Sequence, residues 1–230
     1  VEALQSASFP LDTFVFDMGW HRGTQACWKS GCWGGYSWNT KAFPDHNGLL
    51  AWLHEKHGLQ TAINLHDGDG VLPTDDRYQA MADATGTVGG GPVPFHISNH
   101  TWSDALNKLV LDPLLEEGVD FLWSDWQFGM GGGKGSDGQY GSATFPGTID
   151  VAGLNPTLML NHVRFNHAIR RNLSFGVERQ LRGAVLSRYG GLPNHRYAVG
   201  FGGDVFQSWE SLRGMIVSTA TAANVAFAYW

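Results

Sequence analysis

Five charged or polar residues stand where short apolar segments of the sequence end, and these segments are predicted to be β-strands. The residues are Asp17, His66, Asp125, Arg188 and Asp204. A single polar residue in such a position would indicate only that the chain reaches solvent there. In a parallel α/β barrel, however, the carboxyl ends of all strands open into one mouth, where catalysis takes place. Five such residues on five strands therefore predict one common site.

The residue types in this predicted site favour a neutral substrate or a metal ion, because carboxylates are present without a cluster of basic residues. Two carboxylates that face each other can split an acetal: one attacks or stabilises the sugar carbon, and the other protonates the departing oxygen. Tryptophan faces stack on the apolar side of a sugar ring. Five of the ten tryptophans fall near the predicted mouth: Trp20, Trp33, Trp38, Trp123 and Trp126. Trp123 alternates with Leu122 inside a predicted strand and is expected to fill the core.

Three patterns that could hold a metal ion or a phosphate do not meet the requirements for doing so. His54 and His57 are three residues apart, whereas zinc proteases place these histidines four apart. The segment 67–70 resembles a calcium loop in miniature but lacks the glutamate that closes such a loop. Lys134, in a glycine-rich segment, is not followed by the serine or threonine of a phosphate-binding loop. We therefore predict no metal site and no cofactor.

Apolar segments alternate with amphipathic helical patterns, which predicts an α/β fold with a parallel sheet. Seven segments are predicted strands: Thr13–Met18, Thr61–His66, Phe95–Ser98, Phe121–Asp125, Ala184–Arg188, Ala198–Asp204 and Val225–Trp230. Five segments are predicted helices: Asn47–His57, Arg77–Ala84, Ser103–Glu117, Thr157–Asn172 and Ser208–Ala223. No Gly-x-Gly-x-x-Gly motif follows the first strand, which favours a (β/α)₈ TIM barrel over a doubly wound sheet. The barrel is expected to be incomplete, with about seven strands present and the eighth missing.

Charge and composition argue against several partners. The net charge is −6 and no Lys/Arg cluster occurs, so no nucleic-acid partner is expected. No apolar run approaches the roughly 18 residues of a membrane span. Cys27 and Cys32 form either a local disulfide or a pair of reduced thiols. Glycosylation triplets begin at Asn99 and Asn172, which gives a lean towards a secreted or secretory-pathway protein and leaves the localisation otherwise open.

Six segments together resemble glycoside hydrolase family 31, and the resemblance runs from about Thr13 to Trp230. They are FVFDMGWH (14–21), WGGYSWNTKAFPD (33–45), GVDFLWSDWQFG (118–129), LNHVRF (160–165), SRYGGLPNHRY (187–197) and GFGGDVFQSWESL (200–212). The resemblance implies a retaining α-glycosidase on a (β/α)₈ barrel that is flanked by β-domains. It also implies a carbohydrate substrate and no metal or organic cofactor.

The resemblance implies a role for each matching residue. Asp125 matches the nucleophile of the family, and Asp204 matches its acid/base. Asp17 matches the carboxylate that holds sugar hydroxyls in the −1 subsite, and Arg188 matches the arginine that contacts substrate and orders the acid/base region. Trp126, which follows the nucleophile, and His66 at the second strand's end are expected to bind substrate with a looser correspondence to the family. Trp20 is also expected to bind substrate, because it lies near the predicted mouth.

Two departures from the family pattern leave the sugar open. The common α-glucosidase branch has an Asn-Glu pair after the nucleophile, whereas this chain has Trp126 and Gln127. Gly19 stands where relatives often have a second acidic residue. Glucose, galactose, N-acetylgalactosamine and other α-sugars therefore remain candidates.

The organisation predicted for residues 1–230 is the catalytic barrel portion of a larger multidomain glycoside hydrolase. The eighth strand and the flanking β-domains are expected in the remaining domains of the parent chain or in another subunit, and the fragment alone is expected to be inactive. The alternative is an inactive carbohydrate-binding or structural barrel within a larger assembly.

Overall fold

A computed structural model describes residues 1–22, 34–97, 99–125, 156–174, 183–188 and 194–226. One sheet of five parallel strands forms its centre, and the strands follow each other in chain order. The strands are β1 (Thr13–Phe16), β2 (Gln60–Leu65), β3 (Phe121–Ser124), β4 (Val185–Ser187) and β5 (Ala198–Gly200). Each strand pairs with the next one along the chain, without the reversal of strand order that defines a doubly wound sheet. This order is that of a TIM barrel opened along one side, as the sequence predicts.

Helices follow the strands and confirm the five predicted helical segments. The α-helices are α1 (Glu2–Ser6), α2 (His46–His57), α3 (Tyr78–Thr85), α4 (His100–Ala105), α5 (Asp112–Glu116), α6 (Pro156–Ser174) and α7 (Trp209–Val225). A π-helical stretch, η4 (Leu106–Leu111), joins α4 to α5. Short 3₁₀ turns occur at η1 (Met18–Trp20), η3 (Asp67–Asp69) and η6 (Asn194–Arg196). Within the described ranges, no helix combines the length and the apolar character needed to cross a membrane.

The boundaries of helix α2 follow from its sequence. Asp45 accepts a hydrogen bond from the backbone N–H of Gly48 at 2.9 Å and so caps the first turn. Gly58 ends the helix in the left-handed conformation, with φ at 66°, and its N–H donates to the carbonyl of His54. The chain then enters β2 directly, so these two caps fix where the second strand begins.

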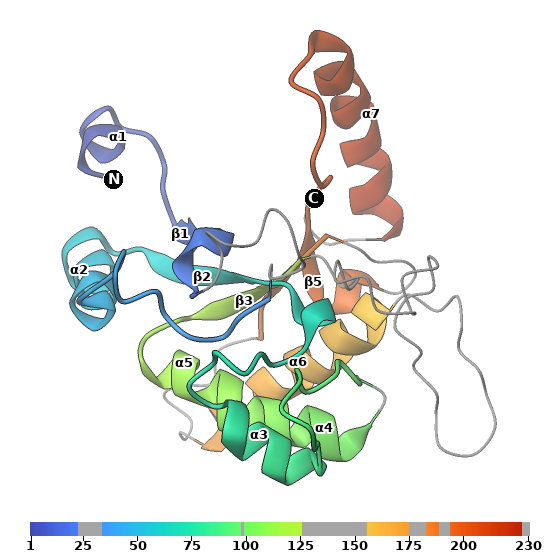
Figure 1. Cartoon of the computed structure of the whole chain (residues 1–230). Helices are drawn as coiled ribbons and strands as arrows, with labels where there is room; N and C mark the ends of the chain where they lie inside the picture. The colour runs from blue at the N-terminus through green and yellow to red at the C-terminus, as the bar shows by residue number, and fades with distance from the viewer. Residues whose placement is uncertain (23–33, 98, 126–155, 175–182, 189–193, 227–230) are drawn as a thin grey trace.

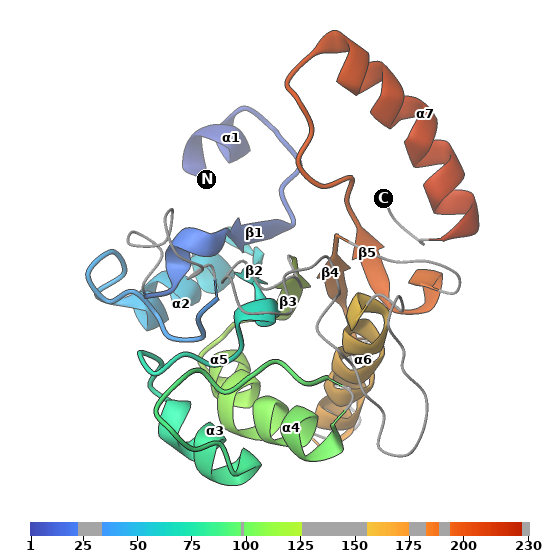
Figure 2. The same ribbon diagram turned by 45° about the vertical axis from the view of Figure 1, so that its right-hand side comes forward.

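The core lies between the sheet and the helices that cover it. Every residue of β2 after Gln60 is buried, as expected for a central parallel strand. Figures 1 and 2 place α3, α4, α5 and α6 together along one side of the sheet, whereas α7 projects away from it and buries none of its residues. The largest fully buried aliphatic side chains come from α2, β2, α3 and η4: Leu50, Leu53, Ile63, Leu65, Met81, Leu106 and Leu111.

A buried ion pair ties helix α6 to the loop after β2. Arg164 donates to Asp67 Oδ1 at 2.5 Å and to Ser124 Oγ at 2.6 Å, and the two charged side chains are 2% and 0% exposed. The hydroxyl of Tyr36 donates to the same carboxylate oxygen at 2.6 Å. Burial, reinforced by the charge of Asp67, raises the pKa of Tyr36 well above 10, so this hydroxyl keeps its proton. Four segments that are distant in sequence are thereby held together.

One of the seven predicted strands is wrong, and another lies mostly outside the described residues. Residues 95–97 form no strand, because β2 pairs directly with β3 and leaves no place between them. The nearest extended pairing is a single antiparallel bridge between Val71 and Val93. Val225 is the last residue of α7, and residues 227–230 lie outside the described part of the chain. The described part of the sheet therefore has five strands, and the predicted strand over 227–230 stays untested.

Replacing Arg164 with methionine is expected to lower the free energy of unfolding by about 3–5 kcal/mol, because the Asp67 carboxylate would stay buried without its cation. Urea denaturation of the intact protein measures this loss. The control is Lys56→Met, which breaks an ion pair with Glu2 whose side chains are 58% and 63% exposed. We expect the control to leave the urea midpoint close to that of the parent. Equal midpoints for the two variants would contradict the structural role assigned to Arg164.

Candidate active site

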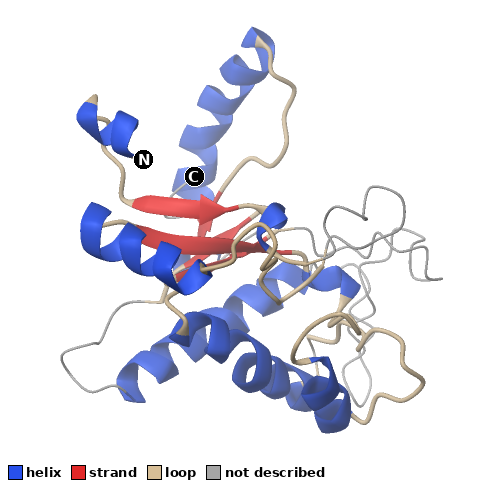
Figure 3. Cartoon of the chain, turned by 60° about the vertical axis from the view of Figure 1, so that its left-hand side comes forward, coloured by secondary structure: helices blue, strands red, loops and turns tan. Residues whose placement is uncertain are grey.

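The residues predicted for the site converge at the carboxyl edge of the sheet. Asp17, Asp125 and Arg188 directly follow β1, β3 and β4, and Asp204 lies four residues beyond the end of β5. Figure 3 shows the strands pointing in one direction towards loops on the same side. Hydrogen bonds and ion pairs then connect the side chains in a continuous line: Asp17, Asn64, Asp125, Arg188 and Asp204. The geometry thus brings together four residues that come from four different strand ends.

Asp125 lies at the centre of this line and is 3% exposed. Its Oδ1 accepts a hydrogen bond from Nε of Arg188, and its Oδ2 accepts one from Nδ2 of Asn64 at 2.9 Å. Its backbone N–H donates to the carbonyl of Leu65 at 3.0 Å, so the sheet ladder continues one residue beyond β3. A buried carboxylate needs such partners, since burial of an uncompensated charge is costly. Backbone and side chain are therefore both held in place.

Arg188 joins two carboxylates that have different surroundings. Its Nε contacts Asp125, whose side chain is 5% exposed, and its Nη2 lies 3.4 Å from Oδ2 of Asp204, whose side chain is 95% exposed. The guanidinium also stands 4.9 Å from the ring centre of Phe201, a cation–π contact. Phe201 in turn packs edge-to-face on Trp123 with ring centres 5.1 Å apart. The arginine is thereby fixed from three directions.

Gly203 gives Arg188 the room that it occupies. A Cβ atom built on Gly203 would lie 2.6 Å from Nη1 of Arg188, which is too close for two heavy atoms. Gly203 also has a φ of +75°, a conformation that side chains with a Cβ rarely adopt. The glycine that precedes Asp204 is therefore required both by the turn and by the arginine next to it.

Asp17 forms the opposite end of the line and remains exposed to solvent. Its Oδ1 accepts hydrogen bonds from the backbone N–H of Met18 at 2.7 Å and from Nδ2 of Asn64 at 2.9 Å. The first of these bonds caps the 3₁₀ turn η1. Asp17 is thus oriented by its own loop and by β2, while its carboxylate stays accessible to a ligand.

His66 directly follows β2 and is 5% exposed, with Nε2 at 3.5 Å from Oδ2 of Asp125. Burial lowers the pKa of His66 below its ordinary 6.5, and the nearby charge of Asp125 opposes this effect without reversing it. The neutral imidazole therefore predominates at pH 7. In that form it adds no second cation beside Arg188.

Trp20 does not present a ring to the mouth of the barrel, which corrects the expectation that it contacts substrate. Its side chain is 1% exposed, its Nε1 donates to the backbone carbonyl of Asn64 at 2.7 Å, and its ring packs edge-to-face on Trp38 at 5.0 Å. Trp38 is likewise buried, at 4% exposed. Both rings fill the space beneath the site because edge-to-face aromatic packing stabilises a core.

Some expectations fall outside the described residues. The ranges 23–33 and 126–155 contain Trp33, Cys27, Cys32 and Trp126. The substrate-binding role predicted for Trp126 and the state of the two cysteines therefore stay predictions. Among the residues that are described, no group of three His, Cys, Asp or Glu side chains is arranged to hold a metal ion.

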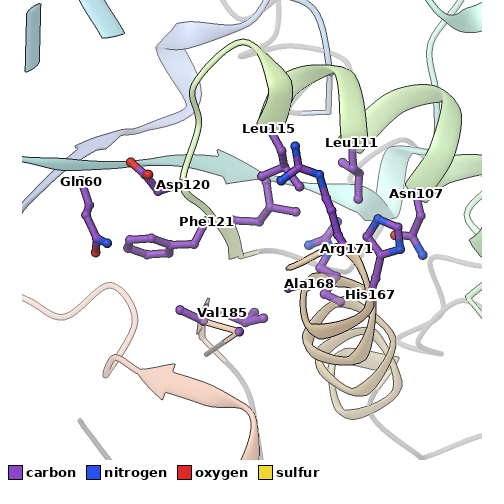
Figure 4. Close-up of a pocket in the computed structure, with 14 residues that line it drawn as sticks. Gln60, Asn107, Leu111, Leu115, Asp120, Phe121, His167, Ala168, Arg171 and Val185 are labelled. Carbon is purple, nitrogen blue, oxygen red and sulfur yellow. The ribbon is translucent and has the colours of Figure 1, made fainter. Parts of the chain in front are cut away.

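A cavity of about 210 Å³ lies away from this line of residues, between α5, α6 and the amino ends of the strands (Figure 4). Leu111, Leu115 and Val185 form part of its apolar wall. Arg171 and His167, which also line it, contact the carboxylate of Asp112 at 3.5 and 2.7 Å. In TIM barrels the amino ends of the strands contribute to stability, and catalysis takes place at the other end. This cavity is therefore not the predicted site.

Asn64, Phe201 and Gly203 take part in the site but were not predicted from the sequence. The sequence pattern could have identified Asn64, because it is the one amide side chain inside the apolar segment TAINL. A polar residue inside a buried strand needs hydrogen-bond partners, and at this edge those partners are carboxylates. Phe201 and Gly203 lie in the segment 200–212 that carries the family resemblance, but their contacts with Arg188 could not be predicted from it.

The parallel sheet with chain-ordered strands and converging side chains at its carboxyl edge places this chain among the TIM-barrel domains. The family can be named as well. Residues 1–230 match the family described as "Glycosyl hydrolases family 31 TIM-barrel domain", so the chain belongs to glycoside hydrolase family 31. This confirms both the family resemblance and the barrel fold predicted from the sequence.

Solved structures with the same fold include a xylosidase from Aspergillus niger and the family 31 α-xylosidase from Xanthomonas citri, each with a TM-score of 0.63. Their identities to this chain are 16% and 18%. Each similarity covers 96% of this chain but only 33% and 24% of the respective solved chain, so this chain spans at most a third of their length. A comparison with curated proteins gives no match.

Replacing Gly203 with alanine is expected to lower the free energy of unfolding by about 1–2 kcal/mol, because the left-handed conformation is unfavourable for a residue with a Cβ. The new methyl group would also displace Arg188 from its position beside Asp204. Chemical denaturation measures the first effect and a crystal structure of the variant the second. Gly91→Ala is the control, since a Cβ at Gly91 meets nothing within 4 Å. A Gly203 variant as stable as the control would contradict this account.

The lowered pKa of His66 predicts that stability decreases as the pH falls below 6.5, the ordinary value for histidine. The unfolded chain binds a proton there while the folded chain does not, so acid favours unfolding until the lower, folded-state pKa is passed. His66→Gln is expected to make the free energy of unfolding less dependent on pH in this range. His195→Gln, at an exposed position, serves as the control. An unchanged pH dependence in the His66 variant would show that this prediction is wrong.

Proposed function

We propose that this chain is the catalytic barrel of a retaining α-glycosidase, with Asp125 as nucleophile and Asp204 as general acid and base. One observation carries the proposal: the guanidinium of Arg188 contacts both carboxylates. The side chain of Asp125 is 5% exposed, and that of Asp204 is 95% exposed. A retaining mechanism needs two carboxylates at one cleft with different surroundings, because one must be ionised while the other carries a proton. Membership of family 31 supports the same assignment.

The first step transfers the sugar to the protein. A carboxylate oxygen of Asp125 forms a bond to the anomeric carbon while the bond from that carbon to the leaving oxygen breaks. The electron pair goes to the leaving oxygen, which takes the proton of Asp204. Both oxygens of Asp125 already hold hydrogen bonds, from Arg188 and from Asn64, so the attacking group is oriented before substrate binds.

The second step releases the sugar. Asp204, now ionised, accepts a proton from a water molecule while the water oxygen attacks the anomeric carbon, and the bond to Asp125 breaks. Two displacements at the same carbon restore its original configuration. An exposed position suits Asp204 because it must exchange protons with a leaving group and then with water. The net reaction is hydrolysis of the glycoside to a free sugar and an alcohol.

The proposed substrate contacts surround these two carboxylates. Asp17 is exposed beside the line and can accept hydrogen bonds from sugar hydroxyls in the −1 subsite. Arg188 is proposed to contact the substrate as well as to order Asp204. His66, which lies next to Asp125, is proposed to bind substrate, and Trp126 is proposed to bind it as well. The binding role expected for Trp20 is withdrawn, because its ring is buried.

Residues 1–230 are proposed to be one part of a larger multidomain hydrolase. The outer strands of the described sheet, β1 and β5, have no second strand partner among the described residues. A barrel closes only when its outer strands are paired, so we propose that strands outside the described residues complete it. The coverage of 33% and 24% of the two solved xylosidases supports the same organisation. We therefore propose the activity for the whole protein.

The identity of the sugar is tested by a panel of nitrophenyl α-glycosides assayed with the intact protein. The panel contains glucose, galactose and N-acetylgalactosamine, and also xylose because the two solved relatives are described as xylosidases. Release of nitrophenol from one of these glycosides identifies the sugar. Binding of a sugar without release would instead favour a carbohydrate-binding barrel without turnover.

Asp125→Ala in the intact protein is expected to lower kcat by roughly 10⁴-fold, the order of loss seen when a covalent nucleophile is removed. The control is Asp83→Ala, an exposed carboxylate on α3 that is bonded only to Gln79 within the described residues. Proton NMR of the first product formed by the parent enzyme is expected to detect the α anomer. Near-normal kcat in the Asp125 variant, or a β anomer as first product, would overturn the proposed function.

A further inference from the structure

We propose that Asn64 is a positioning residue for the reaction: its amide group fixes the nucleophile Asp125 relative to the substrate-binding carboxylate of Asp17. The two hydrogens of Nδ2 are donated to Oδ1 of Asp17 and to Oδ2 of Asp125, both at 2.9 Å. Asn64 is thus the one described residue that is hydrogen-bonded to both carboxylates. This inference rests on the proposed function, because it assigns Asn64 a role in that reaction.

The orientation of the amide follows from the chemistry of its partners. Ionised carboxylates only accept hydrogen bonds, whereas the Nδ2 group of asparagine has two hydrogens to donate and the Oδ1 atom has none. If the group were turned over, Oδ1 would face two carboxylate oxygens. Its buried Oδ1 has no hydrogen-bond partner within the described residues. The orientation is therefore dictated by Asp17 and Asp125 and not by a bond to Oδ1.

The surroundings of Asn64 keep its side chain from moving. Asn64 is 0% exposed, it lies in the central strand β2, and it pairs in register with Trp123 of β3. Its backbone carbonyl accepts a hydrogen bond from Nε1 of the buried Trp20 at 2.7 Å. A side chain held by packing and by hydrogen bonds on a strand positions a reacting group more accurately than one on a loop.

The charges around this amide explain why a neutral residue suits the position. Asp17 and Asp125 face it from the ends of β1 and β3. Arg188 contacts Asp125 from the end of β4, and His66 contacts it from the end of β2. A third carboxylate in place of Asn64 would add repulsion to both neighbours, and an apolar residue would remove the hydrogen bond that Asn64 donates to the buried Asp125.

The loss of these two hydrogen bonds has a consequence that differs from a loss of stability. A variant without these bonds keeps the other substrate contacts, but the attacking oxygen of Asp125 is less well aligned with the anomeric carbon. Such a misalignment is expected to lower kcat while KM changes much less.

The test compares Asn64→Leu and Asn64→Asp with Asn161→Leu in the intact protein. Asn161 is a matched control: it is also an asparagine with 0% exposure, and its Nδ2 also donates two hydrogen bonds, to Ser187 at 3.1 Å and to Asn194 at 3.0 Å. Kinetics are measured with the best nitrophenyl α-glycoside, at a temperature where circular dichroism finds each variant folded. A misplaced reacting group costs on the order of 10²-fold in rate.

We expect both Asn64 variants to lose about 10²-fold in kcat with a much smaller change in KM. The Asn161 variant is expected to lose stability without this loss of kcat. Normal kcat in a folded Asn64→Leu protein would overturn this inference and leave the proposed function intact. A parent protein that is inactive on every α-glycoside of the panel would overturn both.

Discussion

A carboxylate buried at the end of β3 is the constraint on which the rest of the site depends. Asp125 is 3% exposed, and a charge in such a place persists only when its neighbours donate hydrogen bonds or supply a cation. The two neighbouring strands provide these: β2 contributes the amide of Asn64, and Arg188 follows β4. Asp125 keeps these two partners only if β3 lies between β2 and β4. The site therefore depends on the strand order β2, β3, β4 as much as the fold does.

The parallel sheet makes this arrangement accurate. The backbone N–H of Asp125 donates to the carbonyl of Leu65, and that of Arg188 donates to the carbonyl of Ser124 at 3.2 Å. The hydrogen bonds between strands therefore continue as far as the residues proposed for catalysis and substrate binding. The buried ion pair between Arg164 and Asp67 holds helix α6 against the loop that follows β2. A site built on strand ends and supported by packed helices keeps its geometry without a bound ligand.

The ends of the strands could be predicted from the sequence because polarity changes abruptly there. Asp125 and Arg188 close apolar runs, and their convergence follows from the rule that parallel strands share one edge. The extent of the sheet could not be predicted so well. The segment 95–97 has apolar residues on both sides of His96, as a strand could, but Pro94 precedes it and β2 already pairs with β3. A short apolar run does not reveal whether a neighbour is available to pair with it.

The interior of the site was the part that the sequence could not reveal. Trp20 lies near the predicted mouth in the sequence, yet its ring faces the core and only its Nε1 serves the site, through the carbonyl of Asn64. Asn64 itself looks like a single polar interruption of an apolar strand. Its role depends on two carboxylates that are 47 and 61 residues away in the chain. Interactions over such separations are known only once the fold is known.

The central claim is that Asp125 becomes covalently bonded to the sugar during turnover. Its most direct test is to incubate the intact protein with a fluorinated α-glycosyl fluoride of the preferred sugar, which slows release of the glycosyl group, and to locate the added mass by peptide mass spectrometry. The account predicts one glycosyl group per protein, attached at Asp125 and absent when Asp125 is replaced. A label on another carboxylate, or turnover of this reagent with inversion and no label, would contradict it.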